Sequence, residues 1–148
     1  MSDDDEHREV LRWLRYAAED LAAAEAALGA AAFAPRHTCW LAQQAAEKAI
    51  KAALVLRQVD FPWVHDLDAL RNLLPEDWRI RREQPDLAEL SEWAVEARYP
   101  PSSAPDASAS EAQAAVEQSR AVYECVCDDL ERNGVPLPSK GTPRDRPA

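Results

Sequence analysis

The chain has 148 residues, of which 47% are hydrophobic, and its 27 acidic and 17 basic side chains give a formal net charge of −10. This length and hydrophobic content suit a single domain with a core of its own. The acidic balance is opposite to the basic footprint that nucleic-acid binding through the overall field requires. No apolar run approaches the roughly 18 residues of a membrane span, and the acidic start, unlike the basic start of a signal peptide, favours a cytoplasmic location.

Apolar residues recur at helical spacing along most of the chain. Three long helices are predicted at residues 4–28, 35–59 and 110–133. Two shorter helices are predicted at residues 65–74 and 85–98, and the connection that leads to Pro85 has room for one further turn. No segment alternates with the period of a strand. The sequence therefore predicts an all-α fold, an antiparallel bundle of about five helices, three long and one or two short.

The domain is predicted to cover residues 1–133, with Gly134 at the C-cap of the last helix. Residues 134–148 hold four prolines after Gly134 and almost nothing to bury. We therefore expect this segment to be a disordered, proline-rich tail.

The chain has three cysteines, Cys39, Cys125 and Cys127. An odd number in a chain with no secretory signal favours reduced thiols. No histidine lies near Cys125 and Cys127 in the sequence to complete a zinc site. We therefore expect buried, inert thiols, no metal and no cofactor.

Two short motifs combine residues that can bind a ligand, and each also has an ordinary structural explanation. His65 next to Asp66 could act as a base or an anion ligand, but Asp66 also suits the start of a helix. Arg98 next to Tyr99 could hold a phosphate or a base, but a cation is also favourable at a helix end. The residues alone leave both explanations open.

Polar residues also follow one side of the predicted second helix, from Gln43 to Lys51. Pairs four apart, such as Gln44 with Lys48 and Glu47 with Lys51, stabilise an exposed helix face. The alternative is that this polar stripe lines a groove inside the bundle.

Taken together, four motifs resemble the HEPN domain, the "higher eukaryotes and prokaryotes nucleotide-binding" family. They are Ala-Glu-Asp-Leu (18–21), Gln-Gln-Ala-Ala-Glu-Lys-Ala-Ile-Lys-Ala (43–52), His65-Asp66-Leu67 and Ala97-Arg98-Tyr99-Pro100. Their order along the chain matches the family, and the resemblance covers about residues 8–132.

The resemblance implies a bundle of about five helices that forms a homodimer. It also implies a partner, a minimal nucleotidyltransferase, with which HEPN proteins often form toxin–antitoxin pairs. Many HEPN proteins are ribonucleases with an Arg followed by four to six residues and a His. Here no His follows His65, so this ribonuclease motif is not in its expected place.

Our first hypothesis is therefore a binding module for a nucleotide or for the nucleotidyltransferase partner. The residues predicted to line its site are Gln44, Lys48, Lys51, His65, Asp66, Arg98 and Tyr99. The alternative is a metal-independent ribonuclease toxin that uses Arg98 and His65 in an atypical arrangement, with RNA as its substrate. A third hypothesis is a structural subunit without a small-molecule site.

Overall fold

The structure of the chain, a computed structural model, describes residues 2–96 and 105–138. This part of the chain contains helices and no strand. The helices are α1 (Asp3–Ala27), α2 (Pro35–Leu56), α3 (Leu67–Arg71), α4 (Arg79–Glu83), α5 (Ala88–Glu96) and α6 (Ala109–Arg132). The predicted all-α fold is confirmed, and the further turn expected before Pro85 is α4.

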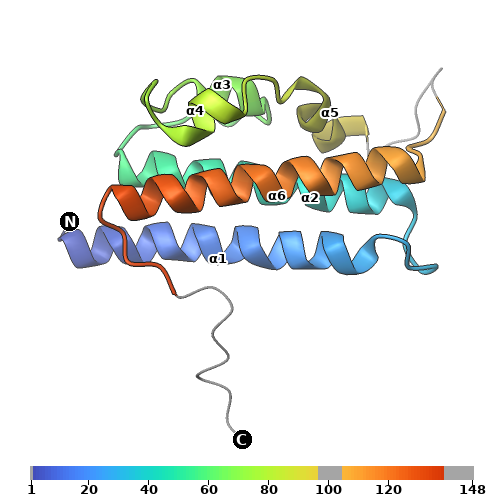
Figure 1. The fold of residues 1–148 in the computed structure, drawn as a ribbon, viewed down its shortest axis with the longest axis horizontal. Coiled ribbons are helices and arrows are strands. Elements are labelled where there is room, and N and C mark those ends of the chain that lie inside the picture. The colour runs from blue at the N-terminus through green and yellow to red at the C-terminus, as the bar shows by residue number, and fades with distance from the viewer. Residues whose placement is uncertain (1, 97–104, 139–148) are drawn as a thin grey trace, which may run out of the picture.

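The three long helices lie side by side, and the three short helices form a layer across them (Figure 1). α1 runs opposite to both α2 and α6. Helix α2 is central, because it packs against α1, α6, α3 and α5. Its alanines, among them Ala42, Ala46 and Ala49, are fully buried and let the neighbouring helices approach closely. Polar side chains on α2 must therefore find partners inside the protein.

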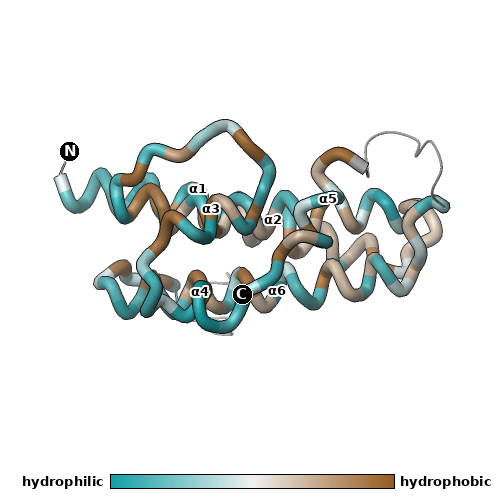
Figure 2. Tube along the Cα trace, turned by 90° about the horizontal axis from the view of Figure 1, so that it is seen from above, coloured by the Kyte–Doolittle hydropathy of each residue, from teal (hydrophilic) through white to brown (hydrophobic). Residues whose placement is uncertain are grey.

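The stripe predicted on the first helix forms its core face. Val10, Leu14, Ala17 and Leu21 are all buried, and hydrophilic and hydrophobic positions alternate along the long helices (Figure 2). The helix begins where the Ser2 hydroxyl accepts a hydrogen bond from the Asp5 N–H (3.2 Å). None of the helices in the described ranges combines the length and apolar character that crossing a membrane requires.

Helix α2 ends at Leu56, three residues before the predicted end. Gln58 adopts a left-handed conformation with a φ of 55°. The Gln58 N–H then donates to the Val55 carbonyl (3.0 Å), and the Val59 N–H donates to the Leu54 carbonyl (3.1 Å). These two bonds close the helix in the geometry that a glycine usually provides.

The third predicted helix is also shorter than expected, since Asp66 is its N-cap and not part of it. The Asp66 carboxylate accepts a hydrogen bond from the Ala69 N–H (3.1 Å). Its neighbour Asp68 accepts hydrogen bonds from the Leu87 N–H (2.9 Å) and from Arg71 (2.5 Å). Asp68 thus joins α3 to the chain that enters α5.

A buried carboxylate of α6 fixes the short helix α4. The two oxygens of Asp129 accept hydrogen bonds from the backbone N–H groups of Arg79 (2.7 Å) and Ile80 (2.9 Å). Burial raises the pKa of Asp129 above its ordinary value, although these two bonds lower it. The carboxylate therefore caps an N-terminus that has no capping side chain of its own.

The segment after Gly134 begins by packing onto the bundle. Gly134 has the left-handed φ of 90° expected of a C-cap glycine. The Val135 N–H donates to the Leu130 carbonyl (3.0 Å), and the Val135 side chain is buried in the core. Leu137 also packs against the core, so residues 135–137 do bury apolar surface, contrary to expectation. Residues 139–148 lie outside the described part.

Candidate functional site

A network of four polar residues joins α2 to the connection before α3; we call Gln43, Glu47, Lys51 and His65 the Glu47 network. One oxygen of Glu47 accepts from Gln43 (3.0 Å) and lies 2.9 Å from His65 Nδ1. The other oxygen accepts from Lys51 Nζ (2.9 Å). Glu47 and Lys51 are buried, whereas half of the His65 side chain is exposed. The network therefore runs from the interior to the surface.

The hydrogen bonds keep Glu47 ionised despite its position. Burial raises its pKa, but the hydrogen bonds from Gln43, Lys51 and His65 more than offset this, and the net pKa lies below the ordinary value. A carboxylate can only accept hydrogen bonds, so His65 Nδ1 must be a donor. In the neutral imidazole, Nε2 is then left as an acceptor on the half-exposed side of the ring.

Three aromatic rings surround the Lys51 ammonium; we call Trp13, Phe61 and Trp63 the aromatic rim. Lys51 Nζ lies 5.9 Å, 5.3 Å and 5.5 Å from their respective ring centroids. Such distances are typical of cation–π contacts. Trp13 and Phe61 are half-buried, but 90% of Trp63 is exposed. A large aromatic ring thus stands in solvent beside Lys51 of the Glu47 network.

The structure brings together three of the predicted site residues. Lys51 and His65 both bind Glu47, and Gln44 donates to the Gln43 side chain (2.7 Å). Three residues of the polar stripe on α2, Gln43, Glu47 and Lys51, are therefore buried and do not form an exposed helix face. The pairs of Glu47 with Gln43 and with Lys51 form as the spacing suggests.

Lys48 and Asp66 point to other partners. Lys48 pairs with Asp20 of α1 (2.5 Å), not with Gln44, and Asp66 caps α3. Arg98 and Tyr99, the remaining predicted site residues, lie outside the described part of the chain.

The aromatic rim and Glu47 were not among the predicted site residues. Two signals were present: Glu47 lies four residues from both Gln43 and Lys51, and Trp63 lies two residues before His65. In an extended connection, residues two apart face the same side. The position of Trp13 on a different helix could not be inferred from spacing.

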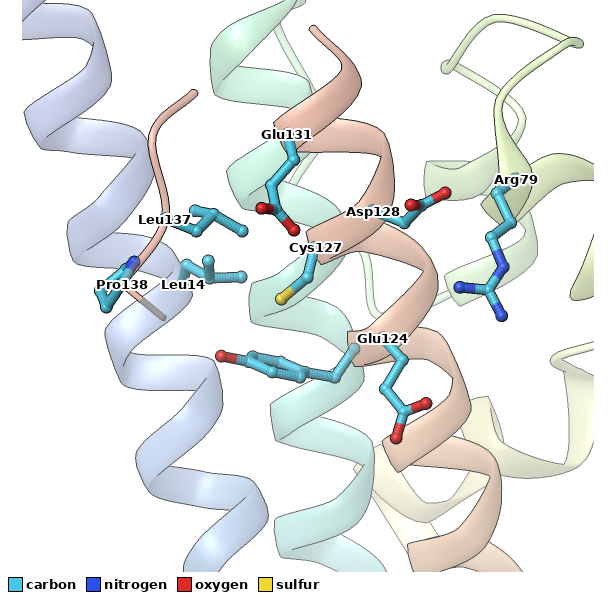
Figure 3. A pocket seen from close by; sticks show the side chains of 9 residues that line it. Leu14, Arg79, Glu124, Cys127, Asp128, Glu131, Leu137 and Pro138 are labelled. Atoms are coloured by element: carbon cyan, nitrogen blue, oxygen red, sulfur yellow. The ribbon is translucent and has the colours of Figure 1, made fainter. Parts of the chain in front are cut away.

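Away from the Glu47 network, a hollow of about 560 Å³ lies where the C-terminal segment meets α1 and α6. Leu14 and Leu137 face Cys127 and Glu131, whereas Arg79 and Asp128 lie on the other side of α6 (Figure 3). Tyr123 also lines it, and burial together with the adjacent Cys127 thiol raises the pKa of this phenol. Tyr123 is therefore not an activated nucleophile.

The cysteines are buried and free of disulfides, as predicted. Burial raises the pKa of Cys39 to about 12 and that of Cys125 to about 11, so both are inert thiols at neutral pH. In the described ranges, His, Cys, Asp and Glu side chains form no group of three or more that could hold a metal ion.

Comparison with known proteins gives one result. The HEPN domain family matches residues 10–131, which is most of the chain. Among curated proteins and among solved structures, no match was found. The matched region contains all six helices apart from the ends of α1 and α6, and both the Glu47 network and the aromatic rim. The chain therefore belongs to the HEPN domain family.

Proposed function

We propose that this chain is a nucleotide-binding HEPN module whose site lies where the Glu47 network reaches the surface beside Trp63. The observation that carries the proposal is the network itself. Burying an ion pair costs several kcal/mol of desolvation for each ion, and apolar residues of similar volume often stabilise a core equally well. A buried pair that orients a half-exposed histidine next to an exposed tryptophan is better explained by a binding role.

The charges of the site suggest weak binding of a free nucleotide. Lys51 is neutralised by Glu47 and Lys48 by Asp20, so neither is an uncommitted cation for a phosphate. Arg98 is the last residue of the helix predicted at residues 85–98, and we expect it to supply the cation that binds the phosphate. One guanidinium does not offset the cost of association, which is of order 4–15 kcal/mol. We therefore expect dissociation constants in the high-micromolar range or weaker.

Titration of ATP and AMP, followed by calorimetry, tests this proposal. We expect both nucleotides to bind the wild type, and Trp63→Ala and Arg98→Ala to weaken binding. Phe33→Ala is the matched control, because Phe33 is also an exposed aromatic residue (48%) but lies in the connection between α1 and α2. No binding by the wild type at millimolar concentration would refute the nucleotide-binding role.

We further propose that the chain works as a homodimer and as the companion of a minimal nucleotidyltransferase, in a toxin–antitoxin-like pair. Membership of the HEPN family supports this proposal. Sedimentation should give twice the monomer mass of 16.5 kDa. A nucleotidyltransferase encoded beside this chain should copurify with it after coexpression. A monomer that fails to copurify would contradict both parts.

One observation favours the ribonuclease alternative. The contact of His65 Nδ1 with an ionised carboxylate is the arrangement that orients a general base. If the chain cleaves RNA, His65→Ala should abolish cleavage and His65→Gln should not restore it. Cleavage that persists in His65→Ala would exclude His65 as the catalytic base.

A further inference from the structure

We propose that the hollow beside Trp63 is a nucleobase pocket that selects guanine. This inference rests on the proposed nucleotide-binding function and specifies which part of the nucleotide is recognised and by which residues. The hollow has a volume of about 640 Å³ and lies between the start of α1, the end of α2 and the connection that follows α2. Its lining residues are Glu6, Val55, Gln58, Val59, Asp60, Phe61 and Trp63.

The walls of this pocket suit a flat aromatic ligand. Val55, Val59 and Phe61 are partly buried and pack against the core, so they form a fixed apolar surface. Trp63 adds an indole ring that is 90% exposed. Lys51 Nζ lies 5.5 Å from the centroid of this ring, a distance typical of a cation–π contact. An exposed aromatic ring is a platform on which a base can stack.

The rim of the pocket is acidic, which determines which part of a nucleotide enters. Glu6 accepts a hydrogen bond from the Gln58 side chain (2.5 Å). Asp60 is exposed and accepts no hydrogen bond from any residue in the described ranges. Two carboxylates repel a phosphate but accept hydrogen bonds from N–H groups. The base therefore enters the pocket, and the phosphates remain outside it.

Asp60 gives the pocket its expected preference among bases. The two oxygens of a carboxylate can accept two parallel hydrogen bonds from adjacent donors. Guanine presents such a pair, N1–H and the N2 amino group. Hypoxanthine keeps N1–H but lacks the amino group, and adenine has an acceptor at N1. Guanosine should therefore bind more tightly than inosine, and inosine more tightly than adenosine.

The test uses the full chain and uncharged nucleosides, so that phosphate repulsion does not enter. Binding of guanosine, inosine and adenosine is followed through the indole N–H signals of a ¹⁵N-labelled sample, in which Trp63→Phe identifies the Trp63 signal. We expect guanosine to shift that signal and to bind about tenfold more tightly than inosine, which lacks one hydrogen bond to a charged group. Trp63→Ala should lower the affinity for each of the three nucleosides about tenfold.

The variant Asp60→Asn tests whether Asp60 causes the preference for guanosine over inosine. It should weaken guanosine binding more than inosine binding, because guanosine donates two hydrogen bonds to the Asp60 carboxylate and inosine donates one, so the difference in affinity between the two nucleosides should shrink. Asp60 is exposed, so this variant is expected to fold normally. Phe33→Ala and Glu76→Gln, at exposed positions outside the pocket, should alter none of the affinities.

Three results would overturn the assignment. If nucleotides bind but Trp63→Ala and Asp60→Asn bind them equally well, the pocket is wrong while the nucleotide-binding function stands. If no nucleoside or nucleotide binds at millimolar concentration, both fail. If agmatine, an organic cation, binds with the expected dependence on Trp63 and Asp60 and guanosine does not, the acidic rim serves a cationic ligand instead.

Discussion

At the scale of single residues, the pairing of Glu47 with Lys51 determines how the site is built. The side chains of Glu47 and Lys51 are only 7% and 6% exposed. All buried side-chain polar atoms in the described part have a hydrogen-bond partner. A buried charge that loses its partner is far more costly than a buried pair is favourable. This asymmetry makes the contribution of the pair measurable.

We predict that Lys51→Met lowers the free energy of unfolding by about 3 kcal/mol, because it leaves an ionised Glu47 without its counter-ion. In that background, Glu47→Gln should restore about 1–2 kcal/mol, since a neutral amide needs no counter-ion. In the wild-type background the same Glu47→Gln change should be destabilising. Urea denaturation of the four proteins measures this reversal of sign. The same sign in both backgrounds would mean that the pair is not coupled.

The depressed pKa of Glu47 predicts a loss of stability in acid. A carboxyl group whose pKa is lower in the folded than in the unfolded state stabilises the fold above its unfolded pKa. It loses this contribution as the pH falls through the folded pKa. The ordinary value is 4.5, so this contribution should be fully present at neutral pH and should be lost in acid, as the pH falls below the ordinary value and through the depressed folded-state pKa. Asp129, whose pKa is raised, has the opposite sign and only reduces the slope.

The comparison of wild type with Glu47→Gln isolates this contribution. The variant starts from a lower stability at neutral pH, and its free energy of unfolding should fall less across the same acid range. Thermal unfolding at several pH values provides the measurement. Parallel curves for the two proteins would show that Glu47 titrates alike in the folded and unfolded states.

At the scale of helices, the end of α2 carries strain next to the site. Gln58 occupies the left-handed position with a φ of 55°, where glycine is favoured because a side chain costs about 1–2 kcal/mol. Gln58→Gly should therefore raise the free energy of unfolding by about 0.5–1 kcal/mol, after loss of the exposed hydrogen bond to Glu6. Arg57→Gly is the control: Arg57 has a φ of −78°, so glycine there should destabilise. Equal effects of the two would rule out relief of strain.

The helices also show how far local sequence determines this fold. The apolar stripes on α1 and α6 and the C-cap glycine Gly134 were predicted from nearby residues, and the structure agrees with them. Features that depend on distant residues were missed. Asp129 caps α4 from 49 and 50 positions away, and nothing near Asp129 in the sequence indicates that role.

In the candidate site, too, the features set by nearby residues were predicted and those that depend on distant residues were missed. The motif on α2 and His65 were found as separate motifs, but their meeting through Glu47 depends on how the connection after α2 returns along that helix. Trp63 was not among the predicted site residues. Whether it lies in the core or in solvent depends on packing, and residue spacing does not specify packing around a loop.

At the scale of the whole molecule, the formal net charge is −10, but some of the acidic groups near the site are paired with basic groups. In the Glu47 network and at Lys48, the acidic and basic groups pair with each other. The unpaired acid near the site, Asp60, stands on the rim of the hollow beside Trp63. Neutral parts of a nucleotide can therefore approach Trp63, whereas its phosphates need a cation from elsewhere. This distribution of charge is consistent with a module that relies on a partner for much of its affinity.

The last prediction concerns where the folded domain ends. Val135 is only 2% exposed and closes α6 through its bond to Leu130. Burying one valine side chain is worth about 1.5–3 kcal/mol, so deletion of residues 135–148 should lower the melting temperature by roughly 5 °C for a domain of this size. Deletion of residues 139–148 should leave it nearly unchanged, and Val135→Ala in the full chain should reproduce part of the loss. Differential scanning calorimetry of the three proteins distinguishes the two boundaries. Equal melting temperatures for both deletions would place the end of the stable domain at Gly134, because Val135 would then contribute nothing measurable to the core.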